Sequence, residues 1–235
     1  MANAIYTYPT QIETLAEEAD VLSAEMFESA LPVQHTREFF SDAQRGIYVG
    51  LWDTTSMRET AGPYPMEEFM VVLQGKADIA LSSGNVRQVQ TDEGFVIPHG
   101  VDCQWQQQGY LKKLFVIVEN PDICPVNENA KEICIFGPEH ANQTYQNNAT
   151  SFVVYPLPEY KTINHQDNCA SLAVVYCHFG AVTYESASQS ADSVMHHCRS
   201  LEVMIIENFS SQNLSFDGNS SGFIVLIHDS RKAKD

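Results

Sequence analysis

The stretch of residues 64–105 constrains the fold most, because short apolar runs follow one another in it and end at glycine or proline. Residues 68–73 and 77–81 are two such runs with a glycine between them, which predicts a β-hairpin. A further run, 95–97, ends at Pro98, which has no amide hydrogen to donate to a sheet. Short strands at this spacing predict an all-β barrel or sandwich.

At these residues the sequence resembles the cupin superfamily. Glu68, six residues and Gly75 match the end of the first cupin motif, G(X)5HXH(X)3-4E(X)6G, and residues 98–100 match the PXG of the second, G(X)5PXG(X)2H(X)3N. The phrases EEFMVVLQG and EGFVIPHGVDCQW look closer still to the branch that includes ureidoglycine aminohydrolases. The resemblance covers residues 46–119 and implies a double-stranded β-helix, or jelly roll.

The motif positions that hold metal ligands in cupins are mostly changed here. Counting back from Glu68, neither spacing of the first motif finds a histidine, and one spacing finds Gly62 and Tyr64. The histidine of the second motif is replaced by Cys103. A transition-metal site needs about three or four converging protein ligands. We therefore expect no metal in the first barrel.

The apolar pattern begins again after residue 150, which predicts two tandem barrels. The predicted matches are 171–180 with 46–52, 201–207 with 67–73, and 222–228 with 94–99. The second repeat lacks a counterpart of the strand predicted at 114–118. One sheet edge would therefore be open unless the N-terminal segment or another subunit covers it.

These patterns divide the chain into four predicted parts. They are an N-terminal arm at 1–38, a first cupin barrel at 39–120, a linker at 121–150 and a degenerate second barrel at 151–235. Apolar residues spaced among acidic ones in 11–29 predict a short amphipathic helix in the arm. The linker is rich in Pro, Asn and Gln and contains one candidate strand at 133–136.

The second barrel holds the better set of metal ligands in the sequence. His196, Cys198 and Glu202 reproduce the HXHX3E spacing with a cysteine as the second ligand, and residues 196 and 198 share one face of a strand. A nitrogen, a thiolate and a carboxylate can bind a divalent transition metal such as Mn, Fe, Ni or Zn. The alternative is a polar connection in which Glu202 is a surface or turn carboxylate.

Glu68 is the candidate catalytic residue of the first barrel. A glutamate that enters a barrel needs a partner or has a raised pKa, so Glu68 is either hydrogen-bonded or ready to transfer a proton. The candidates for binding a ligand around it are Arg58, Tyr64, His99, Cys103 and Trp105. The alternatives are a surface arginine at position 58, a buried thiol at 103 and a core tryptophan at 105.

Composition limits the partners. Thirteen basic and thirty acidic residues give a net charge of −17, which repels the phosphate backbone of nucleic acids. No stretch is apolar and long enough to span a membrane, and no secretory signal is visible at the start. The six cysteines form no CXXC pair and are expected to be reduced thiols in a cytoplasmic protein. The cupin resemblance implies a homodimer.

Three functions remain open from the sequence. The resemblance implies a metal-dependent hydrolase or isomerase of small polar metabolites, built on the ligands of the second barrel. A metal-free binding module would hold a ureide, an organic acid or a sugar-like compound in the first barrel. The third function is a structural or dimeric scaffold without catalysis.

Overall fold

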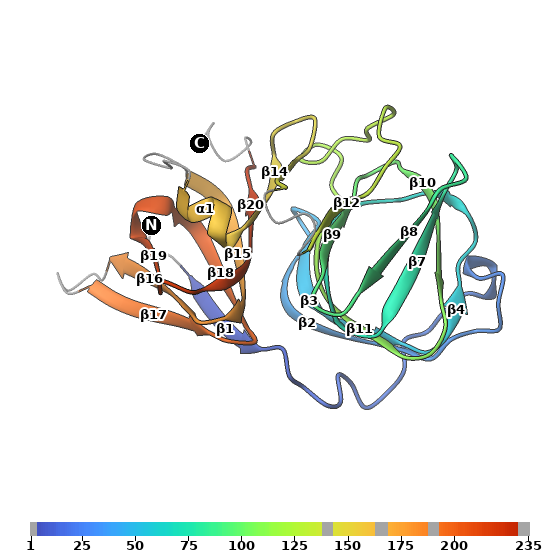
Figure 1. Ribbon diagram of the computed structural model, residues 1–235, viewed down its shortest axis with the longest axis horizontal. Coiled ribbons are helices and arrows are strands. Elements are labelled where there is room, and N and C mark those ends of the chain that lie inside the picture. The colour runs from blue at the N-terminus through green and yellow to red at the C-terminus, as the bar shows by residue number, and fades with distance from the viewer. Residues whose placement is uncertain (1–3, 138–142, 163–168, 188–192, 230–235) are drawn as a thin grey trace. The chain divides into compact units, whose positions relative to one another are not determined.

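Short runs of β-branched and aromatic residues form strands throughout the computed structural model, which describes residues 4–137, 143–162, 169–187 and 193–229. The chain divides into a first unit, Ile12–His140, and a second unit, Met1–Gln11 with Ala141–Asp235 (Figure 1). The predicted all-β class is confirmed, since α1 (Leu157–Thr162) is the only α-helix in the described ranges. No helix in these ranges has the length and apolar character to cross a membrane.

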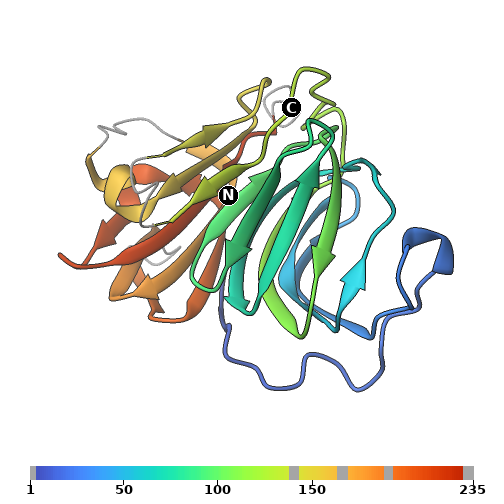
Figure 2. The ribbon, with the colours of Figure 1, turned by 45° about the vertical axis from the view of Figure 1, so that its right-hand side comes forward.

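The strands of the first unit form two sheets (Figure 2). The sheets enclose an apolar core that includes Phe95, Trp105 and Phe115. The larger sheet contains, in order, β12 (Cys134–Phe136), β9 (Gly94–Ile97), β6 (Glu67–Gln74), β11 (Leu111–Val118), β3 (Ile47–Thr54) and β2 (Gln34–Asp42). The smaller sheet contains β4 (Met57–Arg58), β10 (Asp102–Gln107), β7 (Lys76–Leu81) and β8 (Val86–Gln90), with β5 (Gly62–Pro63) also paired to β10. The chain passes repeatedly between the two sheets, which is jelly-roll connectivity.

Gly75 joins two strands of different sheets, so the hairpin predicted over residues 68–81 is wrong. β6 pairs with β9 and β11, whereas β7 pairs with β8 across the turn at residues 82–85. Gly75 has a φ of +91°, and a Cβ atom there would lie 2.4 Å from the carbonyl oxygen of Tyr110. Glycine allows the chain to cross between the sheets at this crowded position.

The second unit has the same topology with fewer strands. Its larger sheet contains β1 (Ile5–Pro9), β18 (Glu202–Ser210), β15 (Cys169–Phe179), β20 (Ser221–Ile227), β14 (Phe152–Pro156) and β13 (Tyr145–Gln146). Its smaller sheet contains β17 (Ser193–Arg199), β16 (Ala181–Ala187) and β19 (Leu214–Phe216), and the 3-10 turn η3 (Ser211–Asn213) precedes β19. β15 pairs with β18 and β20 as β6 pairs with β9 and β11. In the described part of this unit, α1 follows β14 where β4 follows β3.

The internal repeat is displaced by one strand from the matches predicted from the sequence. Glu68 lies opposite one residue of β9 and one of β11, and Ala173 has the same place between β18 and β20. Glu93 and Glu202 each accept a hydrogen bond from the amide three residues earlier, at 2.9 and 2.8 Å. Glu202 therefore corresponds to Glu93, which closes the turn before β9, and not to Glu68.

Strand β1 covers the edge that the sequence leaves open in the second unit. It pairs antiparallel with β18 over five residues, from Ile5 opposite Ile206 to Pro9 opposite Glu202. The amide of Thr10 continues the contact with a 2.9 Å hydrogen bond to the carbonyl oxygen of Leu201. Of the two expected ways of covering this edge, the N-terminal segment is therefore the one found.

The amphipathic helix predicted over residues 11–29 is wrong, and only the 3-10 turn η1 (Ala24–Met26) is helical there. From Ile12 on, the segment belongs to the first unit and makes backbone hydrogen bonds to other residues of it. The amide of Asp20 donates to the carbonyl oxygen of Gln34 at 2.8 Å, and that of Thr60 to Met26 at 2.8 Å. A short isolated helix is marginal in water, so these tertiary partners decide the conformation.

The predicted boundaries of the first barrel and the linker also shift. β2 begins inside the predicted arm, and β12 lies inside the predicted linker and pairs with β9. The strand expected at residues 133–136 is confirmed as β12, but it belongs to the sheet of the first unit. The first unit is therefore larger than the predicted range 39–120.

Gly222 is the most crowded glycine of the second unit, so its substitution tests how closely strands β15 and β20 approach each other. It has a φ of +142°, and a Cβ atom there would lie 2.0 Å from the carbonyl oxygen of Tyr176. We expect Gly222→Ala to lower the free energy of unfolding by about 2–4 kcal/mol, as measured by urea unfolding followed by circular dichroism. Gly218→Ala is the matched control, because nothing lies within 4 Å of its added Cβ atom. Equal stability of the two variants would contradict the backbone geometry.

Candidate functional site

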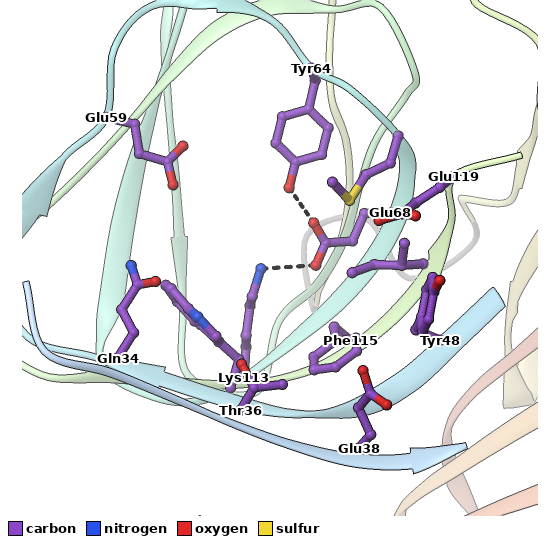
Figure 3. A pocket seen from close by; sticks show the side chains of 13 residues that line it. Gln34, Thr36, Glu38, Tyr48, Glu59, Tyr64, Glu68, Lys113, Phe115 and Glu119 are labelled. Carbon is purple, nitrogen blue, oxygen red and sulfur yellow. Dashed lines mark hydrogen bonds and ion pairs between the residues drawn. The ribbon is translucent and has the colours of Figure 1, made fainter. Parts of the chain in front are cut away.

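A cavity of about 360 Å³ opens on the inner face of the larger sheet of the first unit (Figure 3). Its wall comes from β2, β3, β6 and β11 and from residues 59–66, which connect β4 to β6. Side chains two residues apart on a strand share a face, and this explains why alternate residues line it. The lining residues are Gln34, Thr36, Glu38, Tyr48, Trp52, Glu59, Tyr64, Met66, Glu68, Lys113, Phe115, Ile117 and Glu119.

A buried ion pair lies at the centre of this wall. Lys113 Nζ donates a 2.9 Å hydrogen bond to Glu68 Oε1, and the Tyr64 hydroxyl donates to Glu68 Oε2 (Figure 3). Glu68 is 2% exposed and Lys113 7% exposed. A charge this far from water needs a partner, and each of these two ions supplies the counter-charge of the other.

Two indole rings surround the ammonium group of Lys113. Its Nζ lies 4.8 Å from the ring centroid of Trp52 and 5.0 Å from that of Trp105. The sulfur of Met70 is 3.1 Å from the same nitrogen. Cation–π attraction therefore adds to the ion pair in holding the ammonium at one position.

Glu59 adds a second carboxyl group that points into the cavity (Figure 3). Its backbone is fixed by a 3.0 Å hydrogen bond from its amide to the carbonyl oxygen of Trp105. The pKa of Glu59 is raised to about 7, chiefly by burial; the charge of Lys113 lowers it and the charge of Glu68 raises it by less. Within the described ranges its carboxyl group makes no hydrogen bond or ion pair. The group therefore changes charge near neutral pH, and its oxygens are available to bond a ligand.

Tyr64, unlike Glu59, keeps its proton at neutral pH. Burial raises the pKa of its hydroxyl well above the usual value, and the negative charge of Glu68 raises it further. The hydroxyl therefore stays protonated at neutral pH and acts as a fixed donor to Glu68. One wall of the cavity thus combines a tyrosine, an ion pair and a carboxyl group that titrates near pH 7.

Of the site residues predicted in the first barrel, Tyr64 and Glu68 share the cavity, and Trp105 contacts it through Lys113. His99 lies elsewhere, with its Nδ1 2.8 Å from the carbonyl oxygen of Cys124 and its amide donating to Glu67 at 3.1 Å. These contacts give His99 a structural role at the turn after β9.

The other two predicted ligand-binding residues also lie outside the cavity lining. Burial raises the pKa of the Cys103 thiol to about 12, and the charge of Glu59 contributes, so Cys103 is a protonated core thiol. Arg58 is exposed and contacts Glu28 at 3.1 Å and Gln104 at 3.2 Å. It lines a different cavity, of about 410 Å³, with Lys76 and Asp78.

The three residues predicted to bind a metal, His196, Cys198 and Glu202, make separate contacts in the structure. His196 Nε2 lies 3.0 Å from the Ser186 hydroxyl, and the Cys198 thiol donates to the carbonyl oxygen of Glu202 at 3.3 Å. Burial raises the pKa of the Cys198 thiol far above its usual value, which disfavours the thiolate that binds metals. The Glu202 carboxylate accepts the turn hydrogen bond from Arg199 described above.

The residues of the first unit do not fit a transition metal either. At the cupin ligand positions, the carboxylate oxygens of Glu68 already bond Lys113 and Tyr64, and Cys103 holds its proton at neutral pH. No group of three His, Cys, Asp or Glu side chains arranged to bind a metal occurs within residues 4–137, 143–162, 169–187 and 193–229. The ammonium of Lys113 supplies the positive charge that Glu68 requires.

Lys113 and Glu59 are not identifiable from the cupin motifs, because neither position belongs to them. Lys113 still leaves a signal in the sequence: two adjacent lysines, 112 and 113, begin the apolar run of β11. Neighbouring residues of a strand face opposite sides, so one of the two must point into the fold. Glu59 leaves no comparable signal, since it lies in an irregular connection.

In the described part of the second unit, the Glu68–Lys113 pair has no counterpart. Ala173 stands at the place of Glu68. Gly222 stands at the place of Lys113, because it pairs with Cys177 as Lys113 pairs with Val72. Aromatic side chains fill its interior instead, with Tyr184 stacked on Phe209 at 5.7 Å between ring centroids. The chemistry of the described chain is therefore concentrated in the first unit.

Comparisons with known proteins show what this fold resembles. No known family model and no curated protein matches the sequence. A solved structure of a protein of unknown function from Pseudomonas syringae pv. tomato, of the DUF861 family, has a TM-score of 0.55 and 11% identity, over 94% of this chain and 98% of that one. Protein Ylba from E. coli, also of DUF861, has a TM-score of 0.56 and 10% identity, over 95% of this chain and 90% of that one. At these identities the likeness establishes the fold.

Proposed function

We propose that this chain, which has the jelly-roll fold of the cupin superfamily, binds a small polar metabolite in the cavity of the first unit and does so without a metal ion. Tyr64 and Lys113 are hydrogen-bond donors in that cavity, and Glu68 and Glu59 are acceptors. A cavity of about 360 Å³ is of the size that small-molecule sites have.

The observation that carries this proposal is the buried Glu68–Lys113 pair beside an open cavity. Apolar residues of similar volume would stabilise a core at least as well as a buried ion pair does. A purely structural unit has no need of the pair or of the space beside it. Binding is therefore favoured over the scaffold role, and a cytoplasmic location and a homodimer remain predictions from the sequence.

A thermal-shift screen tests the binding function. We expect at least one compound among ureides, sugars, organic acids and small amines to raise the Tm, because a ligand of the folded state stabilises it by mass action. Ureides are included because of the sequence resemblance to ureidoglycine aminohydrolases. A flat response to every class would refute the binding function.

The Tyr64→Phe variant ties the binding to this cavity. It removes the hydroxyl that contacts Glu68 and keeps the ring, so we expect an identified ligand to bind roughly tenfold more weakly, as for loss of one hydrogen bond to a charged group. Tyr110→Phe is the matched control, since that hydroxyl contacts Asp53 at 3.1 Å and Tyr110 is absent from the cavity lining. Equal affinity in the two variants would place the ligand elsewhere.

Glu59 favours a second function, proton transfer to or from the bound metabolite. General acid–base groups work best when their pKa lies near the working pH, and that of Glu59 is about 7. Incubation of the protein with each ligand from the screen, followed by NMR, would detect turnover. Glu59→Gln should then abolish turnover while retaining binding, and persistence of the reaction in this variant would exclude Glu59 as the proton-transfer group.

A further inference from the structure

The charges that line the cavity are unbalanced. Four lining residues are carboxylic acids, namely Glu38, Glu59, Glu68 and Glu119, and Lys113 is the one basic residue among them. Lys113 is already paired with Glu68, so this ion pair is neutral as a whole. The carboxylates of Glu38 and Glu119 therefore leave the rest of the lining acidic, and this attracts positive charge.

Two of the other carboxylates, those of Glu38 and Glu119, make no ion pair within the described ranges, while Lys113 faces Glu59. No ion pair involves Glu38, Glu59 or Glu119 within the ranges that the structure describes. Glu38 and Glu119 are exposed on β2 and just after β11, at the solvent side of the lining, and the rings of Tyr48 and Phe115 contribute to the same wall. Carboxylates beside aromatic faces are a setting suited to an organic cation.

The protein itself shows how such a setting holds an ammonium group. Lys113 Nζ lies against one carboxylate and two indole rings, at 2.9, 4.8 and 5.0 Å. The same two kinds of group, carboxylates and aromatic faces, line the unpaired part of the cavity. Within the cavity, an anionic ligand would find its one positive group already engaged by Glu68.

From this arrangement we infer that the cavity selects a small organic cation, a primary amine or a guanidinium compound, over a neutral or anionic molecule of the same size. This inference rests on the proposed binding function and narrows its ligand class. The positive group lies near Glu38 and Glu119, and the polar remainder of the ligand faces Tyr64 and the Glu68–Lys113 pair. The net charge of −17 favours the approach of such a cation at low salt.

Three probes of equal length and different charge test the inference. n-Butylammonium, n-butanol and n-butyrate are titrated into the full chain at low salt, and binding is followed by calorimetry and by the Tm. We expect the ammonium compound to bind at least tenfold more tightly than the other two and to lose most of this advantage at about 0.5 M salt, where the screening length is a few ångströms.

Variants connect the preference to named carboxylates. Glu38→Gln and Glu119→Gln should each reduce the affinity for n-butylammonium by two- to fivefold, with little effect on n-butanol. Glu18→Gln is the control, because Glu18 is exposed and absent from the lining. Unchanged affinity in both lining variants would overturn the assignment of these carboxylates.

The outcomes separate the inference from the function on which it rests. If n-butanol, n-butyrate or a neutral or anionic compound of the wider screen binds better than every amine, the cation inference is wrong and the binding function stands. If no compound of any class binds, the proposed function fails and the inference fails with it.

Discussion

Replacing Lys113 by methionine is expected to lower the free energy of unfolding by about 3–5 kcal/mol, the usual cost of breaking a buried ion pair from one side. The variant leaves the Glu68 carboxylate, which is 2% exposed, with the Tyr64 hydroxyl but without a counterion. Methionine keeps the length and the apolar stem of the side chain, so lost packing contributes little. Urea unfolding at pH 7 measures the change through the midpoint and the m-value.

Two further variants serve as controls for the Lys113→Met result. In Glu68→Leu with Lys113→Met neither charge remains, and we expect stability within about 1–2 kcal/mol of the original protein. Lys76→Met is the control for loss of a lysine, because Lys76 is exposed and should change stability by less than ~0.5 kcal/mol. If Lys113→Met alone were as stable as the control, the ion pair would not be desolvated as the structure shows.

Replacing Glu59 by glutamine is expected to change how stability depends on pH. The folded protein holds a proton on Glu59 up to about pH 7, whereas the unfolded chain releases it near pH 4.5. Between these values the folded state binds more protons, so the free energy of unfolding falls as the pH rises through this window. The full effect is roughly 3 kcal/mol for the pKa difference, at 1.36 kcal/mol per unit.

The measurement is urea unfolding of both proteins from pH 5 to pH 8. Glu59→Gln cannot ionise, so its stability relative to the original protein should increase with pH across the window, while Glu18→Gln should run parallel to the original protein. The charged or titratable groups that face Glu59 are Lys113 on β11, Glu68 on β6, Tyr64 before β6 and Cys103 on β10. A difference curve that is flat with pH would show that the pKa of Glu59 is not raised in the folded state.

The fold was largely predictable because it depends on local patterns. Alternating apolar residues, together with glycine and proline at the ends of runs, predict the strands β6, β7 and β9. The pairing of these strands is not local. Whether the chain turns back into the same sheet or crosses to the other at Gly75 depends on the backbone around Tyr110, far away in the sequence.

The register of the repeat shows a related difficulty. Glu68 and Glu202 both precede an apolar run, so the sequence favours matching them. The structure gives them different roles, an interior ion for Glu68 and a turn acceptor for Glu202. Better landmarks were Gly75 and Gly180, which follow β6 and β15 with φ values of +91° and +86°.

The candidate site was half predictable. Tyr64 and Glu68 lie at motif positions and were found, whereas Lys113 and Glu59 come from elsewhere in the chain. Lys113 lies opposite Trp52 of β3 and shares its inward face, whereas Lys112 lies opposite Asp53, and the sequence does not reveal this register. Spacing along β17 places His196 and Cys198 on one face but does not determine where the Glu202 carboxylate lies, and in the structure it accepts the amide of Arg199.

The pairing of strand β1 has a consequence for the order in which the two units fold during synthesis. Its partner β18 lies near the other end of the chain, with Ile5 opposite Ile206. Synthesis proceeds from the N-terminus, so the first unit can fold on the ribosome while β1 still lacks a partner. The second unit can pair this early strand only after β18 has been made, and the pairing has a very high contact order. Refolding of the second unit should accordingly be slow, and a chaperone that shields an unpaired strand edge would act at this stage.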